Sequence, residues 1–183
     1  MNTEHFSQCD SMITAAMEYC DLIDHCHHDS SNRYWLRHME KLLPRLHTAV
    51  LCLQVPTISR CGYDFPDDDQ RCDLFMTLIE LLWNDSILWS DFDRKDIKQC
   101  MCECLADDFT DIYFDLRKGL HLLNQHPENP IIAQNIWHSS FYAHWGQHLM
   151  DAESWLHAVE ARNYTSISAT LNSFNLTFNS ASN

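Results

Sequence analysis

Apolar residues recur at the three- and four-residue intervals of an α-helix through most of this sequence, and few residues interrupt the pattern. The chain of 183 residues contains only three glycines and five prolines. All-β proteins use both residue types heavily in their tight turns, so this scarcity argues against a sheet fold. The sequence therefore predicts an all-α, single-domain bundle of about five main helices joined by shorter pieces.

The predicted helices cover residues 3–28, 32–54, 71–82, 94–125 and 131–162. Pro44 predicts a kink or a short break in the second helix, because proline removes a backbone donor and crowds the preceding turn. The stretch 71–82 is apolar on nearly every side, so we expect it to be the central helix, covered by its neighbours. The two long C-terminal helices, about 94–125 and 131–162, are expected to pack together.

The same pattern predicts how the chain is divided. Residues 1–162 form the helical bundle domain. Residues 163–183 are rich in asparagine, serine and threonine, and we expect this tail to be partly docked or disordered.

Charge and cysteine content narrow the class of protein. The formal net charge is −14 and no basic stripe is visible, which disfavours nucleic-acid binding, because a phosphate backbone rewards clustered lysine and arginine. No apolar run approaches the roughly 20 residues of a membrane helix, and the first twenty residues lack the pattern of a signal peptide. Nine irregularly spaced cysteines are then expected to be reduced thiols in the cytoplasm. An acidic surface is compatible with an unidentified protein partner.

The stretch from Phe141 to His157 combines helical apolar spacing with residues that can bind a metal. At about 100° per residue, its aromatic and aliphatic residues share one arc, which also contains His148. His144 and Asp151 lie together on one flank of that arc. His144 and His148 are one turn apart and Asp151 follows three residues later, so the three side chains can form a chelating edge.

The preceding predicted helix carries four aspartates within little more than two turns. Asp107 and Asp111 point away from its apolar arc, so we expect them to be solvated. Asp108 and Asp115 stand at the edge of the arc, where they can meet a neighbouring helix and complete a coordination sphere or accept the second N–H of a histidine. The candidate cluster for a divalent metal therefore consists of His144, His148, Asp151, Asp108 and Asp115.

The same residues also have a purely structural interpretation. A buried imidazole needs partners, because an unsatisfied polar group costs about 1–3 kcal/mol. A hydrogen bond from His148 to Asp108 or Asp115 would fix the register of two helices, and the cluster would then have no catalytic role. The sequence contains no HExxH motif, no pair of ExxH motifs and no third histidine at a clear site on another helix, so it assigns no catalytic residue.

Four segments in fixed order carry a resemblance to a known family. They read MITAAMEYCDLID (12–24), LLPRLHTAVLCLQVP (42–56), LADDFTDIYFDLRKGL (105–120) and HWGQHLMDAESWLH (144–157). Together they resemble a family of small bacterial all-helical proteins that is known only as a domain of unknown function. The resemblance implies a helical bundle without an assigned activity and leaves the tail after about residue 163 outside. It also implies that the following residues occupy motif positions of the family: Asp108, Asp115, His144, Trp145, Gly146, His148 and Asp151.

Three functions are compatible with these observations. The first is a cytosolic, non-enzymatic interaction or accessory module in which the His/Asp cluster is structural and no cofactor is bound. The second is a metal-dependent, hydrolase-like enzyme with its site between the last two long helices. The third is an acidic mimic that binds a basic protein.

Overall fold

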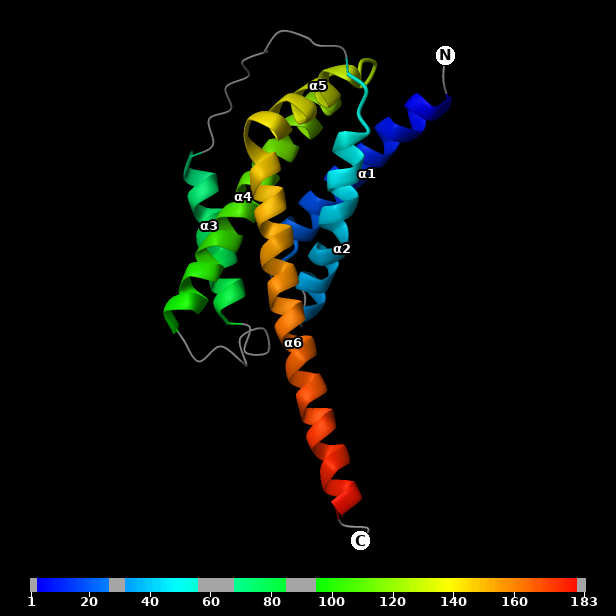
Figure 1. Cartoon of the computed structure of the whole chain (residues 1–183). Helices are drawn as coiled ribbons and strands as arrows, with labels where there is room; N and C mark the ends of the chain where they lie inside the picture. The colour runs from blue at the N-terminus through cyan, green and yellow to red at the C-terminus, as the bar shows by residue number, and fades with distance from the viewer. Residues whose placement is uncertain (1–2, 27–31, 56–67, 85–94, 181–183) are drawn as a thin grey trace.

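The computed structural model describes residues 3–26, 32–55, 68–84 and 95–180 (Figure 1). The all-α prediction is confirmed, because the elements within these ranges are helices and no strand occurs among them. The elements are α1 (Thr3–Asp24), α2 (Asn32–Leu51), α3 (Asp68–Trp83), α4 (Lys95–Gln125), α5 (Ile131–Ser140), the short π-helix η1 (Phe141–Trp145) and α6 (Gly146–Ser180).

The core is organised around α4, which packs against α1, α3, α5, η1 and α6. Its residues Leu105, Phe109, Ile112 and Leu116 recur at intervals of four, three and four and are fully buried. The hydroxyl of Tyr19 in α1 donates to the backbone oxygen of Phe109 over 2.9 Å. Helix α4 is therefore the scaffold on which other helices place their side chains.

The prediction that residues 71–82 form the central helix is wrong. Helix α3 packs mainly against α4, and its buried residues are Leu78 and Leu82. Met76 is 58% exposed and Trp83 is 38% exposed, so these apolar side chains of α3 are not covered as those of a central helix would be. An all-round apolar composition does not say how many neighbours cover a helix. Among the described elements, α4 is the main neighbour of α3.

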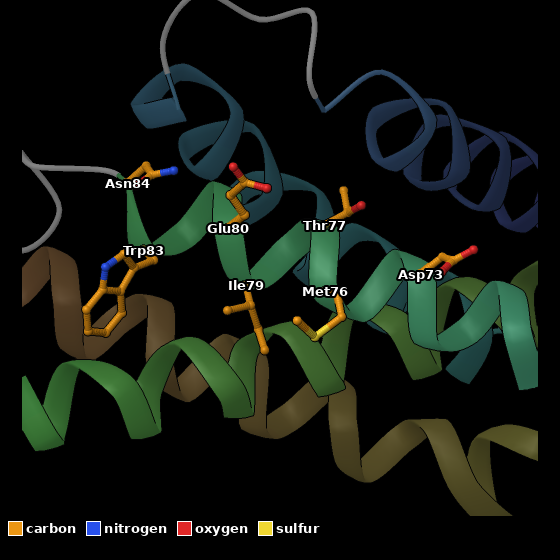
Figure 2. A pocket seen from close by; sticks show the side chains of 7 residues that line it. All are labelled: Asp73, Met76, Thr77, Ile79, Glu80, Trp83 and Asn84. Atoms are coloured by element: carbon orange, nitrogen blue, oxygen red, sulfur yellow. The ribbon is translucent and has the colours of Figure 1, made fainter.

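A surface hollow on α3 shows this one-sided packing. It has a volume of about 640 Å³ and includes Ile79, Thr77 and Glu80 in its lining. In Figure 2, Ile79 extends toward α4, whereas Thr77 and Glu80 extend away from it. The hollow contains no histidine, so it is not a candidate for the predicted metal cluster.

The C-terminal third of the chain bends between two helices. Figure 1 shows the chain changing direction between α5 and α6, and η1 lies at that bend. The predicted packing of the two long C-terminal helices is confirmed by the contact of α4 with α6. Helix α6 continues to Ser180, beyond the predicted end near residue 162, and its last part projects past the bundle (Figure 1). Among the described helices, α6 included, none has both the length and the apolar character needed to cross a membrane.

Pro44 does not break its helix. Helix α2 runs from Asn32 to Leu51 with Pro44 inside it. The hydroxyl of Thr48 donates to the backbone oxygen of Pro44 over 2.8 Å. The predicted short break is therefore absent from α2.

Candidate metal site between α4 and α6

Three aspartates on α4 face two histidines on the chain that crosses it. Asp108, Asp111 and Asp115 are spaced by three and four residues, so they share one face of the helix. His144 lies in η1 and His148 one turn further on in α6. Because α4 packs against both elements, the five side chains meet at this contact. We call them the His/Asp cluster.

The outer two aspartates hold the histidine rings. His148 Nδ1 lies 2.9 Å from Asp108 Oδ1, and His144 Nδ1 lies 2.6 Å from Asp115 Oδ2. Both distances are those of charge-assisted hydrogen bonds in which the ring N–H donates to the carboxylate. A carboxylate on Nδ1 orients the ring and leaves Nε2 as the nitrogen that can bind a metal.

The Nε2 atoms both turn toward Asp111. Its Oδ2 atom lies 3.0 Å from His148 Nε2 and 3.6 Å from His144 Nε2. One possible ligand atom from each of the three residues lies within 4.8 Å of the other two. Ligand atoms on a tetrahedral zinc ion, at roughly 2.0–2.2 Å from the metal, are roughly 3.4 Å apart. Two imidazoles and one carboxylate therefore converge at a separation suited to one ion.

The electrostatic balance of the cluster favours an added positive charge. Its three carboxylates meet two permanent cations, Lys118 beside Asp115 at 3.1 Å and Arg71 beside Asp111, which leaves an excess of one negative charge when both imidazoles are neutral. Among the described residues, Asp108 Oδ2 is buried and has no hydrogen-bond partner. A buried oxygen without a partner costs free energy until a proton or a cation reaches it.

The pKa values of one pair reflect this balance. Burial raises the pKa of the Asp108 carboxyl above its ordinary value, and the hydrogen bond from His148 opposes that rise. The hydrogen bond to Asp108 raises the pKa of His148, although burial of the ring acts in the opposite direction. Both nitrogens of His148 face carboxylate oxygens, an arrangement that suits an imidazolium or a ring that binds a metal through Nε2.

The π-helix η1 sets the direction of His144. The backbone N–H of Gly146 donates to the backbone oxygen of Phe141, five residues earlier, which adds one residue to that turn. A Cβ atom on Gly146 would lie 2.4 Å from the Phe141 oxygen, so a side chain there is excluded by contact. Turns of this type occur frequently at functional sites, and His144 lies within this one.

The structure brings together four of the five predicted cluster residues. His144, His148, Asp108 and Asp115 meet as two hydrogen-bonded pairs. The fifth, Asp151, instead accepts hydrogen bonds from Gln147, with both carboxylate oxygens at 3.0 Å from its amide nitrogen.

Asp111 is a member of the cluster that the apolar pattern of the sequence does not identify, since that pattern predicts a solvated side chain. That expectation is wrong, because the Asp111 side chain is only 13% exposed and Arg71 of α3 pairs with it. The apolar arc of α4 does not include the side of the helix that α3 covers. The three-and-four spacing of Asp108, Asp111 and Asp115, matched against His144 and His148, was the signal in the sequence.

A second group of possible ligand atoms adjoins the first. Asp107, Asp108 and His148 also place one such atom each within 4.8 Å of the others. This group shares His148 with the first. Asp107 is exposed, so we take Asp111, His144 and His148 as the primary ligand set.

The fold and the site define an all-helical protein with an interhelical histidine–aspartate cluster. The chain belongs to the family described as "Domain of unknown function (DUF5063)", whose model matches residues 3–162. The resemblance stated from the sequence is thus confirmed. The chain is also similar in fold to the crystal structure of protein BF1032 from Bacteroides fragilis, with a TM-score of 0.62 and 20% identity over 81% of this chain and 89% of that one. None of the curated proteins matches the chain.

Proposed function

We propose that this protein binds one divalent transition-metal ion through Asp111, His144 and His148 and uses it as a hydrolase-like metal enzyme. The observation that carries the proposal is the convergence of two Nε2 atoms on one carboxylate oxygen, while each Nδ1 atom is held by a separate aspartate. Two histidines and one carboxylate form a recognised set for zinc or iron and leave positions open for water or substrate.

Each residue of the His/Asp cluster then has a distinct role. Asp111, His144 and His148 bind the ion. Asp108 and Asp115 orient the two imidazoles. A bound ion supplies a water of lowered pKa or polarises a substrate oxygen.

The competing function is a non-enzymatic interaction or accessory module. In that case the two His–Asp pairs join α4 to η1 and α6, and Arg71 and Lys118 offset part of the charge without any metal. The same contacts support this function, so an ion-binding measurement must separate the two.

Metal titration of the full chain, made without a histidine tag and stripped with a chelator, tests the proposal. Co²⁺ is the probe, because its visible absorption reports coordination number as well as binding, and Zn²⁺ competition gives the affinity. We expect one ion per chain and a spectrum of four- or five-coordinate cobalt. His148→Ala should abolish the signal.

His157→Ala is the matched control. His157 is an exposed histidine on the same helix, and its loss should leave cobalt binding unchanged. Absence of stoichiometric binding in the wild-type protein, or equal binding by wild type and His148→Ala, would overturn the metal proposal and favour the non-enzymatic module.

A further inference from the structure

A small hollow adjoins the His/Asp cluster between α3 and α4. Its volume is about 260 Å³, below the roughly 300–1,000 Å³ of pockets that take drug-sized ligands. Its lining comes from both helices and consists of Arg71, Cys72, Phe75, Asp107, Thr110 and Asp111. Asp111 belongs to both the hollow and the proposed ligand set, so a molecule in the hollow lies beside the metal site.

Arg71 is the cationic side chain in the lining, and its neighbours hold it in place. Its guanidinium pairs with Asp111 and lies over the ring of Phe114, 5.0 Å from the ring centroid. The side chain remains 33% exposed. A guanidinium carries five N–H donors in one plane, and a single carboxylate uses only part of them. Arg71 is therefore suited to bind a second, incoming anionic group by paired hydrogen bonds.

The charge of the hollow depends on the ion. Without a metal, the carboxylates of Asp107 and Asp111 outweigh Arg71 by one negative charge, which repels an anion. A divalent ion on Asp111 reverses this balance to one net positive charge. Anion binding in the hollow should therefore require the metal.

We propose that this hollow is the subsite for the phosphoryl or carboxylate group of a small anionic substrate, which Arg71 recognises beside the bound ion. This inference rests on the proposed metal site and adds its substrate class. The small volume selects a compact anionic group and not a whole nucleotide.

Phosphorus relaxation on the full chain tests the subsite. Bound Mn²⁺ is measured first by electron paramagnetic resonance, and inorganic phosphate is then titrated while its ³¹P relaxation is recorded. Manganese accelerates the relaxation of a nucleus close to it, so the signal reports phosphate beside the ion. Acetate, followed by ¹³C relaxation, forms the second arm and distinguishes carboxylate from phosphoryl ligands.

We expect saturable relaxation with one of the two anions and about tenfold or greater weakening in Arg71→Gln, since a hydrogen bond to a charged group contributes about 1.5–3 kcal/mol. The comparison is made at equal bound manganese. Arg37→Gln is the control, because Arg37 pairs with Glu160 elsewhere on the surface, and it should bind like wild type. If Arg71→Gln does not fold, Arg71→Lys, which keeps the charge without the planar fork, should weaken binding in the same direction.

The outcomes separate the two proposals. No bound manganese in wild type would contradict the metal site itself. Two results would overturn the subsite alone. In the first, manganese binds but changes the relaxation of neither anion; in the second, the relaxation changes equally in wild type and Arg71→Gln. Phosphate or acetate binding of equal strength with and without manganese, measured by isothermal titration calorimetry, would also overturn it.

Discussion

Asp111 carries the most specific prediction about a single side chain. Its Oδ2 atom is the oxygen on which both histidines converge, whereas Asp115 contacts one of the two histidines, His144, through Nδ1. Loss of an outer partner typically lowers metal affinity about 10–100-fold. We expect Asp115→Asn to fall within that range and Asp111→Asn to exceed it, as measured by competition with a chromophoric chelator.

Glu103→Gln is the control for that series. Glu103 is exposed on the same helix and accepts a hydrogen bond from Gln99. The metal affinity of Glu103→Gln should equal that of wild type. Equal losses in Asp111→Asn and Asp115→Asn would show that Asp111 has no role beyond that of the outer aspartates.

The pH dependence of the ion-stripped protein follows from the pair His148 and Asp108. Because the pKa of His148 is raised in the fold, its contribution to the free energy of unfolding is present below the ordinary histidine pKa of about 6.5. That contribution disappears as the pH rises through the folded-state value. The pKa of Asp108 is also raised, so its protonated form is favoured in the fold and its effect has the same sign.

Urea unfolding between pH 5.5 and 9 measures this effect. Wild type should lose stability relative to His148→Gln as the pH rises, and the His148 ring signals should titrate above the ordinary value. A wild-type advantage that grows with increasing pH would contradict the sign.

Much of the cluster was predictable from helical spacing. This spacing puts His144 and His148 on one edge of the last predicted helix, and Asp108 and Asp115 on one edge of the helix before it. The role of Asp111 was not predictable in this way. Its burial depends on Arg71, which lies forty residues away in the sequence. Asp151 satisfies the helical spacing equally well, but its neighbour Gln147 donates to it.

At the scale of elements, the π-helix η1 determines where His144 points. Gly146→Ala places a methyl group against the Phe141 oxygen, so the turn must change and the histidine must move. We expect Gly146→Ala to lower both the thermal midpoint and the metal affinity, as measured by calorimetry and by cobalt titration.

Gly119→Ala is the control for this prediction, because it should lower stability without changing the geometry of the metal site. A Cβ atom there would lie 2.0 Å from Trp137 Nε1, which donates to the Leu116 backbone oxygen over 3.0 Å. Overpacking of this kind costs about 1–3 kcal/mol, and metal affinity should stay near that of wild type. If Gly146→Ala lowers stability in the same way and leaves affinity unchanged, η1 does not set the site.

Helical periodicity identified the helices but not their neighbours. Helix α3 is apolar on nearly all sides, yet it lies at the surface of α4. Burial depends on how many elements pack around a helix, and the apolar pattern does not give that number. The π-turn was equally hidden, since a helix with one added residue keeps nearly the same local pattern in the sequence.

At the scale of the whole molecule, residues 163–183 are predicted to be dispensable for the site. The family match ends at residue 162, and the last part of α6 projects past the bundle (Figure 1). A chain ending at Arg162 should therefore keep its cobalt spectrum and its thermal midpoint within a few degrees of wild type. A loss of folding on truncation would show that the tail contributes to the bundle.

The most direct test of the metal site is the anomalous scattering of zinc in crystals of the full chain grown with one equivalent of Zn²⁺. We expect one strong peak at about 2.0–2.2 Å from the Nε2 atoms of His144 and His148 and from a carboxylate oxygen of Asp111. A map with no peak at these three residues, or with zinc bound only elsewhere, would contradict it.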